Sequence, residues 1–177
     1  MKTILFFLSL IYTGNSFSQS PWIISETFPG NKLDWPLKND AETESRLNDK
    51  GYEIIYKGEK SLNAYGDFSL TNNGDFFIEV IQKQLSENKN KGCGIIFGCN
   101  TTGTNQDGYI FIIAPNGGYA ISTLNGTNLV KPRSSPFINQ APGSTNKLKV
   151  MQIGKRWLFY INDNDVDFID APVAGNQ

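Results

Sequence analysis

Carboxylates are the first residues to consider for chemistry, because the chain contains no histidine. Ser-His-Asp and Cys-His catalysis in their usual form are thereby excluded, as are the common histidine-ligated zinc sites. Asp75 and Glu79 share one predicted strand, in the stretch GDFFIEV. Four residues along a strand span ~13 Å, whereas paired glycosidase carboxylates lie roughly 5–9.5 Å apart. They would act only with partners from other strands, and two polar residues on a sheet face are the simpler interpretation.

The two cysteines are the next candidates, in the stretch KGCGIIFGCN. On an extended strand Cys93 and Cys99 lie ~20 Å apart, and a disulfide needs Cα atoms about 4.4–6.8 Å apart. Two cysteines without histidine do not complete a tetrahedral metal site, and the glycines precede no helix that could hold a phosphate. We therefore predict a buried strand with two inert thiols, whose glycines permit bulges or close strand approach. A bridge stays open if Gly94 or Gly98 kinks the chain.

The stretch NDNDVD places Asp163, Asp165 and Asp167 at alternate positions, like the opening of a calcium loop. An EF-hand loop needs Gly at its sixth position and Glu at its twelfth, and this chain has Phe168 and Ala174 there. We predict a charged hairpin turn and no cofactor, with calcium as an open alternative.

Aromatic residues are numerous, with 12 Phe, 7 Tyr and 3 Trp. Most should pack in a core. Tyrosine and tryptophan also bind sugars, because the ring covers a sugar face and the polar tip forms hydrogen bonds. The candidate ligand-binding residues are Trp35, Tyr109 and Tyr119, with Asn105 and Asp107 as partners for sugar hydroxyls. For each ring, packing in the core is the competing interpretation.

Short segments rich in Ile, Val, Phe and Tyr recur between turn residues, which predicts an all-β sandwich or barrel without a long helix. Hairpin turns are expected at Asn116-Gly117-Gly118 and at Gly154-Lys155. Segments apolar on both faces, at 76–78, 95–97 and 109–113, are expected to be central strands. Residues 40–51 and 131–146 are expected to be loops. The predicted strands are 52–56, 67–70, 76–81, 94–97, 109–114, 119–123, 148–153, 157–161 and 166–169.

The first residues have the order of a secretory signal peptide. Lys2 precedes the apolar run 4–11, and Ser16 and Ser18 form a small-x-small pattern, so we predict cleavage after Ser18. A buried N-terminal strand is the alternative. The remaining residues, 19–177, fit one domain that is exported to the periplasm, the cell surface or the medium. Loss of Lys2 leaves 15 basic against 17 acidic residues, so the surface has no bulk attraction for nucleic acid or anionic lipid.

Six motifs in order resemble concanavalin A-like lectin/glucanase jelly rolls, and more closely the exported laminin G-like and keto-disaccharide-hydrolase-like modules common in Bacteroidota. The similarity covers nearly all of residues 27–169. It implies a jelly-roll β-sandwich of two antiparallel sheets. The motifs are ETFPGNKLDWP, GYEIIY, GDFFIEVIQ, GIIFG, GYIFIIAPNGGYAI and NKLKVMQIGKRWLFYIND.

Two departures from that family limit what the resemblance implies. Its β-glucan-cleaving members carry E-x-D-x-x-E on one strand, and this chain has only Asp75 and Glu79 there, so no catalytic residue is carried over. Such sandwiches also close with one more strand after the FYIN hairpin, so we expect the domain to lack its last strand, leaving a sheet edge open.

The resemblance therefore implies a non-catalytic carbohydrate-binding module that recognises a glycan on a sheet face and its bordering loops. One alternative is a glycoside-processing enzyme using Asp75, Glu79 and Asp107. Another is a structural or protein-interaction module of a longer surface protein, because fold does not determine function. The expected partner is a polysaccharide or other glycan, without nucleic acid and without membrane insertion after cleavage.

Overall fold

The computed structural model describes residues 3–11, 23–26, 28, 30–58, 75–85, 91–100 and 107–170. These residues form a β-sandwich of two antiparallel sheets, as the pattern of short strands predicts, and contain no helix. In the same ranges no helix is long and apolar enough to cross a membrane.

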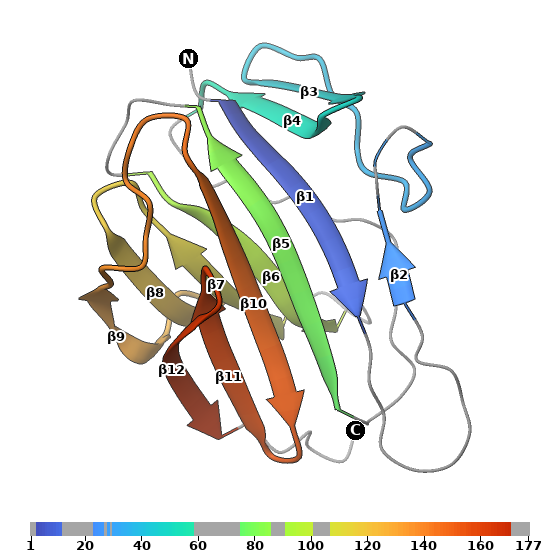
Figure 1. Ribbon diagram of the computed structural model, residues 1–177. Helices are drawn as coiled ribbons and strands as arrows, with labels where there is room; N and C mark the ends of the chain where they lie inside the picture. The colour runs from blue at the N-terminus through green and yellow to red at the C-terminus, as the bar shows by residue number, and fades with distance from the viewer. Residues whose placement is uncertain are drawn as a thin grey trace.

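The large sheet has eight strands, in the order β12-β11-β10-β5-β1-β4-β3, with β2 beside β1 (Figure 1). All of its pairings are antiparallel. Its strands are β1 (Thr3–Ile11), β2 (Ile23–Ser25), β3 (Thr43–Asn48), β4 (Gly51–Tyr56), β5 (Phe76–Gln84), β10 (Thr145–Ile153), β11 (Arg156–Ile161) and β12 (Asn164–Asp170).

The small sheet lies behind the large one in Figure 1 and has the order β6-β7-β8-β9. Its strands are consecutive along the chain and pair with one another in sequence order. They are β6 (Cys93–Asn100), β7 (Asp107–Ile113), β8 (Gly118–Thr123) and β9 (Asn128–Ser134).

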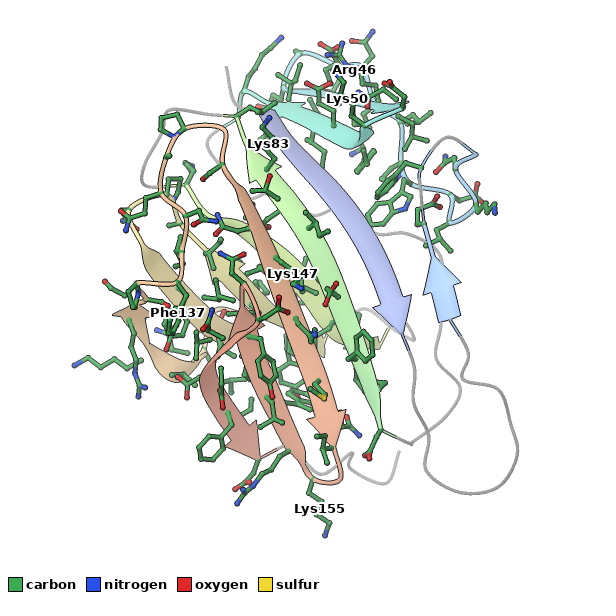
Figure 2. All side chains as sticks on the ribbon, viewed as in Figure 1. Arg46, Lys50, Lys83, Phe137, Lys147 and Lys155 are labelled. Carbon is green, nitrogen blue, oxygen red and sulfur yellow. The ribbon has the colours of Figure 1, made fainter. Side chains whose placement is uncertain are left out.

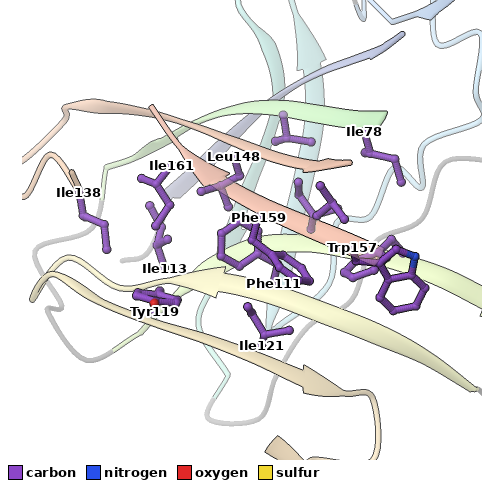
Figure 3. Packing of buried hydrophobic residues seen from close by; sticks show 14 of the residues in the cluster. Ile78, Phe111, Ile113, Tyr119, Ile121, Ile138, Leu148, Trp157, Phe159 and Ile161 are labelled. Atoms are coloured by element: carbon purple, nitrogen blue, oxygen red, sulfur yellow. The ribbon is translucent and has the colours of Figure 1, made fainter. Parts of the chain in front are cut away.

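The core lies between the inner faces of the two sheets (Figure 3). Alternation along each strand places one set of side chains there: Leu148 and Val150 of β10 are fully buried, as are Phe159 and Ile161 of β11. Phe159 packs edge-on against Phe111 of the small sheet, with ring centroids 5.2 Å apart. Aromatic rings from both sheets therefore share one core.

Most predicted strands are confirmed, as are the hairpin turns at 114–118 and 154–155. A third turn at 162–163 is also confirmed, but of the three aspartates predicted for it only Asp163 lies there, and Asp165 and Asp167 are on β12. Gly117 and Gly154 adopt positive φ in the first two turns, and Asn162 and Asp163 do so in the third. The predicted strand 67–70 lies outside the described residues.

Two segments expected to be loops contain strands. Residues 43–48 form β3, whose inward positions hold the buried Thr43 and Ser45. Polar residues fit there because the Ser45 hydroxyl donates to the Pro36 carbonyl (2.8 Å) and accepts from the Lys38 amide (2.8 Å). Residues 128–134 form β9, which tolerates Pro132 because it is an edge strand. The expectation of central strands holds for β5 and β7 but is wrong for β6, which is the other edge of the small sheet.

The cysteine-bearing segment is a strand, as predicted, and Cys93 and Cys99 are not joined by a disulfide. Cys93 is buried, but Cys99 is exposed, which corrects the prediction of two buried thiols. The reason is a β-bulge: the register shifts between Phe97 and Asn100, and Gly98 has a φ of 60°. The additional residue reverses the alternation, so Cys99 leaves the inner face.

The predicted leader includes a strand of the large sheet. Residues 3–11 form β1, which lies between β5 and β4 (Figure 1). This is the arrangement that the alternative interpretation of the N-terminus describes. Cleavage after Ser18 stays a prediction, and it would remove a strand from the middle of the sheet.

Candidate functional site

The two tyrosines predicted to bind ligand belong to the core of the sandwich. Tyr119 is 6% exposed, and its hydroxyl donates to the Val166 carbonyl at 3.1 Å. Tyr109 is partly buried against the core, with its ring centroid 4.6 Å from that of Trp157. Core packing, the competing interpretation for each ring, therefore describes both residues.

Trp35 lies in an aromatic cluster with Phe28 and Tyr52, two buried rings of the same hydrophobic core. Its ring centroid is 5.2 Å from that of Tyr52, and it is partly buried against the core. The preceding turn is held by Asn31, whose side chain accepts from the Trp35 amide (2.7 Å) and donates to the Trp35 carbonyl (3.2 Å). Trp35 thus contacts the rings of Phe28 and Tyr52, whereas Tyr109 contacts those of Phe97 and Trp157. The described ring contacts do not bring the two predicted residues together.

The two predicted hydroxyl partners are less fully described. Asn105 lies outside the described residues, and Asp107 begins strand β7.

The carboxylates of the enzyme alternative do not form a constellation. Asp75 accepts from the Gly154 amide at 2.7 Å, which ties the start of β5 to the β10–β11 turn. Glu79 lies on the large sheet, whereas Asp107 belongs to the small sheet. Within the described ranges, no group of three or more Cys, Asp or Glu side chains is arranged to hold a metal ion.

A different group of side chains gathers on the outer face of the large sheet. Its members on the strands alternate with buried residues such as Ile78, Leu148 and Phe159, so they point away from the core. Figure 2 shows Lys147 on this face, over β10. We name this group the outer platform; it consists of Phe77, Glu79, Lys147, Lys149, Tyr160 and Asp163.

Charges at the centre of the outer platform are paired. Lys149 Nζ lies 3.2 Å from Glu79 Oε2, and Lys147 Nζ lies 2.6 Å from Asp163 Oδ1. Lys147 also lies 4.0 Å from Glu79. The four groups form a network in which each ammonium is within reach of both carboxylates.

Two aromatic rings flank this network. Lys149 Nζ lies 5.4 Å from the centroid of the Phe77 ring and 6.0 Å from that of Tyr160, within the range of a cation–π contact. All three side chains are half-buried. The platform thus presents two apolar ring surfaces around a cluster of hydrogen-bonding groups.

The network alters proton affinities at its exposed end. The hydrogen bond from Lys147 lowers the pKa of the Asp163 carboxyl, and the same bond raises the pKa of the Lys147 ammonium, to which Glu79 also contributes. Burial raises the pKa of the Tyr160 phenol, and the nearby Asp165 adds to the effect. The Tyr160 hydroxyl therefore stays protonated at neutral pH and can donate a hydrogen bond.

A hollow of about 360 Å³ lies beside the turn between β3 and β4. Lys83 reaches it from β5, four residues after Glu79, so it lies on the same face as the outer platform. Glu53 on its wall is paired with Arg46 at 2.8 Å. The lining residues are Arg46, Asn48, Asp49, Lys50, Glu53, Lys83 and Leu85.

The residues of the outer platform, apart from Glu79 and Asp163, were not identified as candidates from the sequence. The available signal was the alternation itself: Phe77 and Glu79 on one strand, and Lys147 and Lys149 on another, occupy outward positions. Which outward residues become neighbours depends on the register of β5 with β10, in which Glu79 is opposite Lys149.

Scans of the sequence against protein-family models and curated proteins, and of the fold against solved structures, found no match.

Proposed function

We propose that this chain is an exported, non-catalytic β-sandwich module of the concanavalin A-like jelly-roll type, which binds a glycan on the outer platform. The observation that supports it best is the pair of rings, Phe77 and Tyr160, which both lie close to Lys149 Nζ and so beside its ion pair with Glu79. Aromatic faces cover the apolar faces of sugar rings, and fixed carboxylate and ammonium groups form hydrogen bonds with sugar hydroxyls.

The outer platform suits this role better than the tyrosines singled out from the sequence. Tyr119 is almost fully buried, and Tyr109 packs against Trp157. A sugar could reach the Tyr119 ring only by opening the core, and the face of Tyr109 that packs against Trp157 is covered. The positions of Phe77 and Lys83 on β5 span ~20 Å along one face, so a chain of several sugar units could run from the platform toward the hollow.

Export is part of the proposal. We propose that residues 1–18 are a leader removed after Ser18. The intact mass of the protein recovered outside the cytoplasm tests this, because the cleaved chain begins at Gln19.

Affinity electrophoresis of the full chain through gels containing single soluble polysaccharides tests the glycan site. We expect one glycan to retard the protein, and Phe77→Ala or Tyr160→Ala to weaken this binding about tenfold, equivalent to about 1.4 kcal/mol. Tyr160→Phe should keep most of the affinity, because it keeps the ring. Leu129→Ala, an exposed apolar residue on β9, is the matched control and should change nothing.

Two results would contradict the proposal. Retardation that is lost in Trp35→Ala but kept in Tyr160→Ala would move the site to the Trp35 cluster. No retardation by any polysaccharide, with or without calcium, would favour a structural or protein-interaction role.

A further inference from the structure

Strand β1 occupies a seam in the large sheet, by which we mean the facing backbone edges of β4 and β5 (Figure 1). It pairs with β5 along residues 4–11 and with β4 along residues 3–6, antiparallel to both. The two edges consequently run parallel to each other, two strand spacings or ~9.6 Å apart. The seam has the width and direction for one antiparallel strand.

The segment in the seam is the one that carries the features of a leader. If residues 1–18 are removed on export, as proposed above, the edges of β4 and β5 lose their partner. These edges carry the buried residues Ile54, Ile78 and Val80, each directly opposite a residue of β1 in the register. Unpaired central edges are costly and promote association with other strands. The exported chain therefore needs a replacement strand.

A buried amide indicates that β1 is an imperfect occupant. Gln82 on β5 is 2% exposed, and its Nε2 donates to the Cys93 carbonyl at 3.3 Å. Its Oε1 has no hydrogen-bond partner among the described residues. A buried acceptor without a partner costs about 1–3 kcal/mol. Phe6 of β1 lies opposite Gln82 in the register, and a phenylalanine offers no donor.

We propose that the seam is a binding site for an extended strand of another polypeptide chain, taken up after the removal of residues 1–18, on which this inference rests. The donated strand runs antiparallel to β4 and β5. It carries apolar residues at the positions of Leu8 and Leu10, which lie opposite the buried Val80 and Ile78. It carries a hydroxyl or amide donor at the position of Phe6, within the 4.5–5.5 Å of a cross-strand neighbour of Gln82.

Among the described strands that remain after cleavage, β2 alone is left without a partner, and its three residues are too few to fill the eight paired positions of β5. We therefore place the source in another chain. Strands β3 to β12 are paired within the two sheets, with β12 at the far edge of the large sheet. Strand addition of this kind takes its affinity from main-chain hydrogen bonds and its specificity from alternate side chains.

The experiment starts from the full chain, with a site for a sequence-specific protease inserted between Ser18 and Gln19. The folded protein is cut and then incubated with a fluorescent peptide of residues 3–11 carrying a solubilising lysine tail. We expect saturable uptake of the peptide in place of the cut segment. The same peptide with Leu8→Pro is the control and should not enter, because proline cannot donate within a central strand.

A second pair of peptides tests the donor at the Phe6 position. Phe6→Thr and Phe6→Val differ by a hydroxyl in place of a methyl group. We expect the threonine peptide to bind about fivefold more tightly, as one net hydrogen bond provides. In a chain carrying Gln82→Leu this difference should disappear.

Three outcomes would overturn the inference in whole or in part. If no peptide enters and the cut chain keeps its melting temperature after the segment is washed out, β4 and β5 close on each other or on another segment of the same chain. Uptake of the Leu8→Pro peptide would mean adhesion to an apolar surface. Equal binding of the threonine and valine peptides would remove the proposed donor.

The leader, the seam and the glycan site are tested by separate readouts. Retention of residues 1–18 in the exported protein would overturn the inference, because the seam would keep its own strand, whereas peptide exchange in the cut chain measures only whether the seam accepts a strand. A glycan site on the outer platform is read from retardation in gels, which does not involve the seam.

Discussion

At the scale of single residues, the two cysteines show how much one backbone irregularity decides. They are six positions apart, which on a regular strand would place them on one face. The bulge at Gly98 separates them, so Cys93 is buried while Cys99 is exposed. Burial raises the pKa of the Cys93 thiol to about 12, and partial burial also raises the pKa of Cys99.

We expect an aromatic disulfide reagent at pH 8 to label one thiol of the folded protein rapidly, because only a thiolate attacks and only Cys99 is accessible. Cys99→Ser should abolish the rapid phase, and Cys93→Ser should leave it unchanged. Absorbance of the released aromatic thiol provides the measurement. Equal labelling rates for the two cysteines would contradict the bulge.

The buried thiol of Cys93 makes the free energy of unfolding depend on pH at alkaline pH. The pKa of Cys93 in the folded protein lies above its value of about 8.5 in the unfolded chain. Well below pH 8.5 the thiol is protonated in both the folded and the unfolded state, and it contributes no pH dependence. As pH rises from there toward 12, the unfolded chain releases the proton first, and the free energy of unfolding falls. Cys93→Ser should flatten this decline.

At the scale of elements, close approach between β6 and β7 requires a glycine. Gly94 lies opposite Ile112, and a Cβ atom at position 94 would collide with the backbone carbonyl of Phe111. The obstacle is backbone in the middle of a ladder, so no side chain can turn away to relieve it. This is the close strand approach expected from the glycine-rich sequence around the cysteines.

We predict that Gly94→Ala lowers the free energy of unfolding by about 1–3 kcal/mol, as overpacking does. Gly30→Ala is the matched control: its Cβ would meet only Lys32 Cγ at 3.8 Å, and we expect a change within about 0.5 kcal/mol. Urea denaturation of both variants measures the difference. Similar losses at the two positions would mean that the general effect of replacing glycine, rather than the collision, dominates.

At the scale of the whole molecule, the two sheets are joined through aromatic packing. Phe159 of the large sheet is fully buried, and its ring centroid lies 6.1 Å from that of Phe97 and 5.2 Å from that of Phe111. Both partners belong to the small sheet. Because the buried apolar residues that the structure describes form one cluster between the sheets, the sandwich should unfold as one cooperative unit.

We predict that Phe159→Ala lowers the free energy of unfolding by about 3–5 kcal/mol, the range for removing a buried ring. Phe168→Ala on β12, whose side chain is 55% exposed, should cost less than about 1 kcal/mol. Tryptophan fluorescence and far-UV circular dichroism should report one coincident urea transition for the parent chain. Separate transitions would show that the sheets unfold independently.

The sequence by itself determined the fold class, most strands and three turns. These features depend on local chemistry: alternating apolar residues predict strands, and Asn-Gly or Gly-Lys pairs tolerate the positive φ of hairpins. Strand β3 was missed because its inward residues are polar and are satisfied only by hydrogen bonds to the segment around Pro36. Strand β9 was missed because its proline fits only at an edge.

Only the tertiary structure decided which outward side chains meet. Phe77, Lys149 and Tyr160 come from three strands, and their contact follows from the register between β5, β10 and β11. Each strand also has two faces. Where both faces carry apolar residues, the sequence alone does not show whether a tyrosine such as Tyr119 points into the core or toward solvent. For the same reason the seam around β1 is a property of the sheet: strand order depends on long-range pairing, which local sequence does not encode.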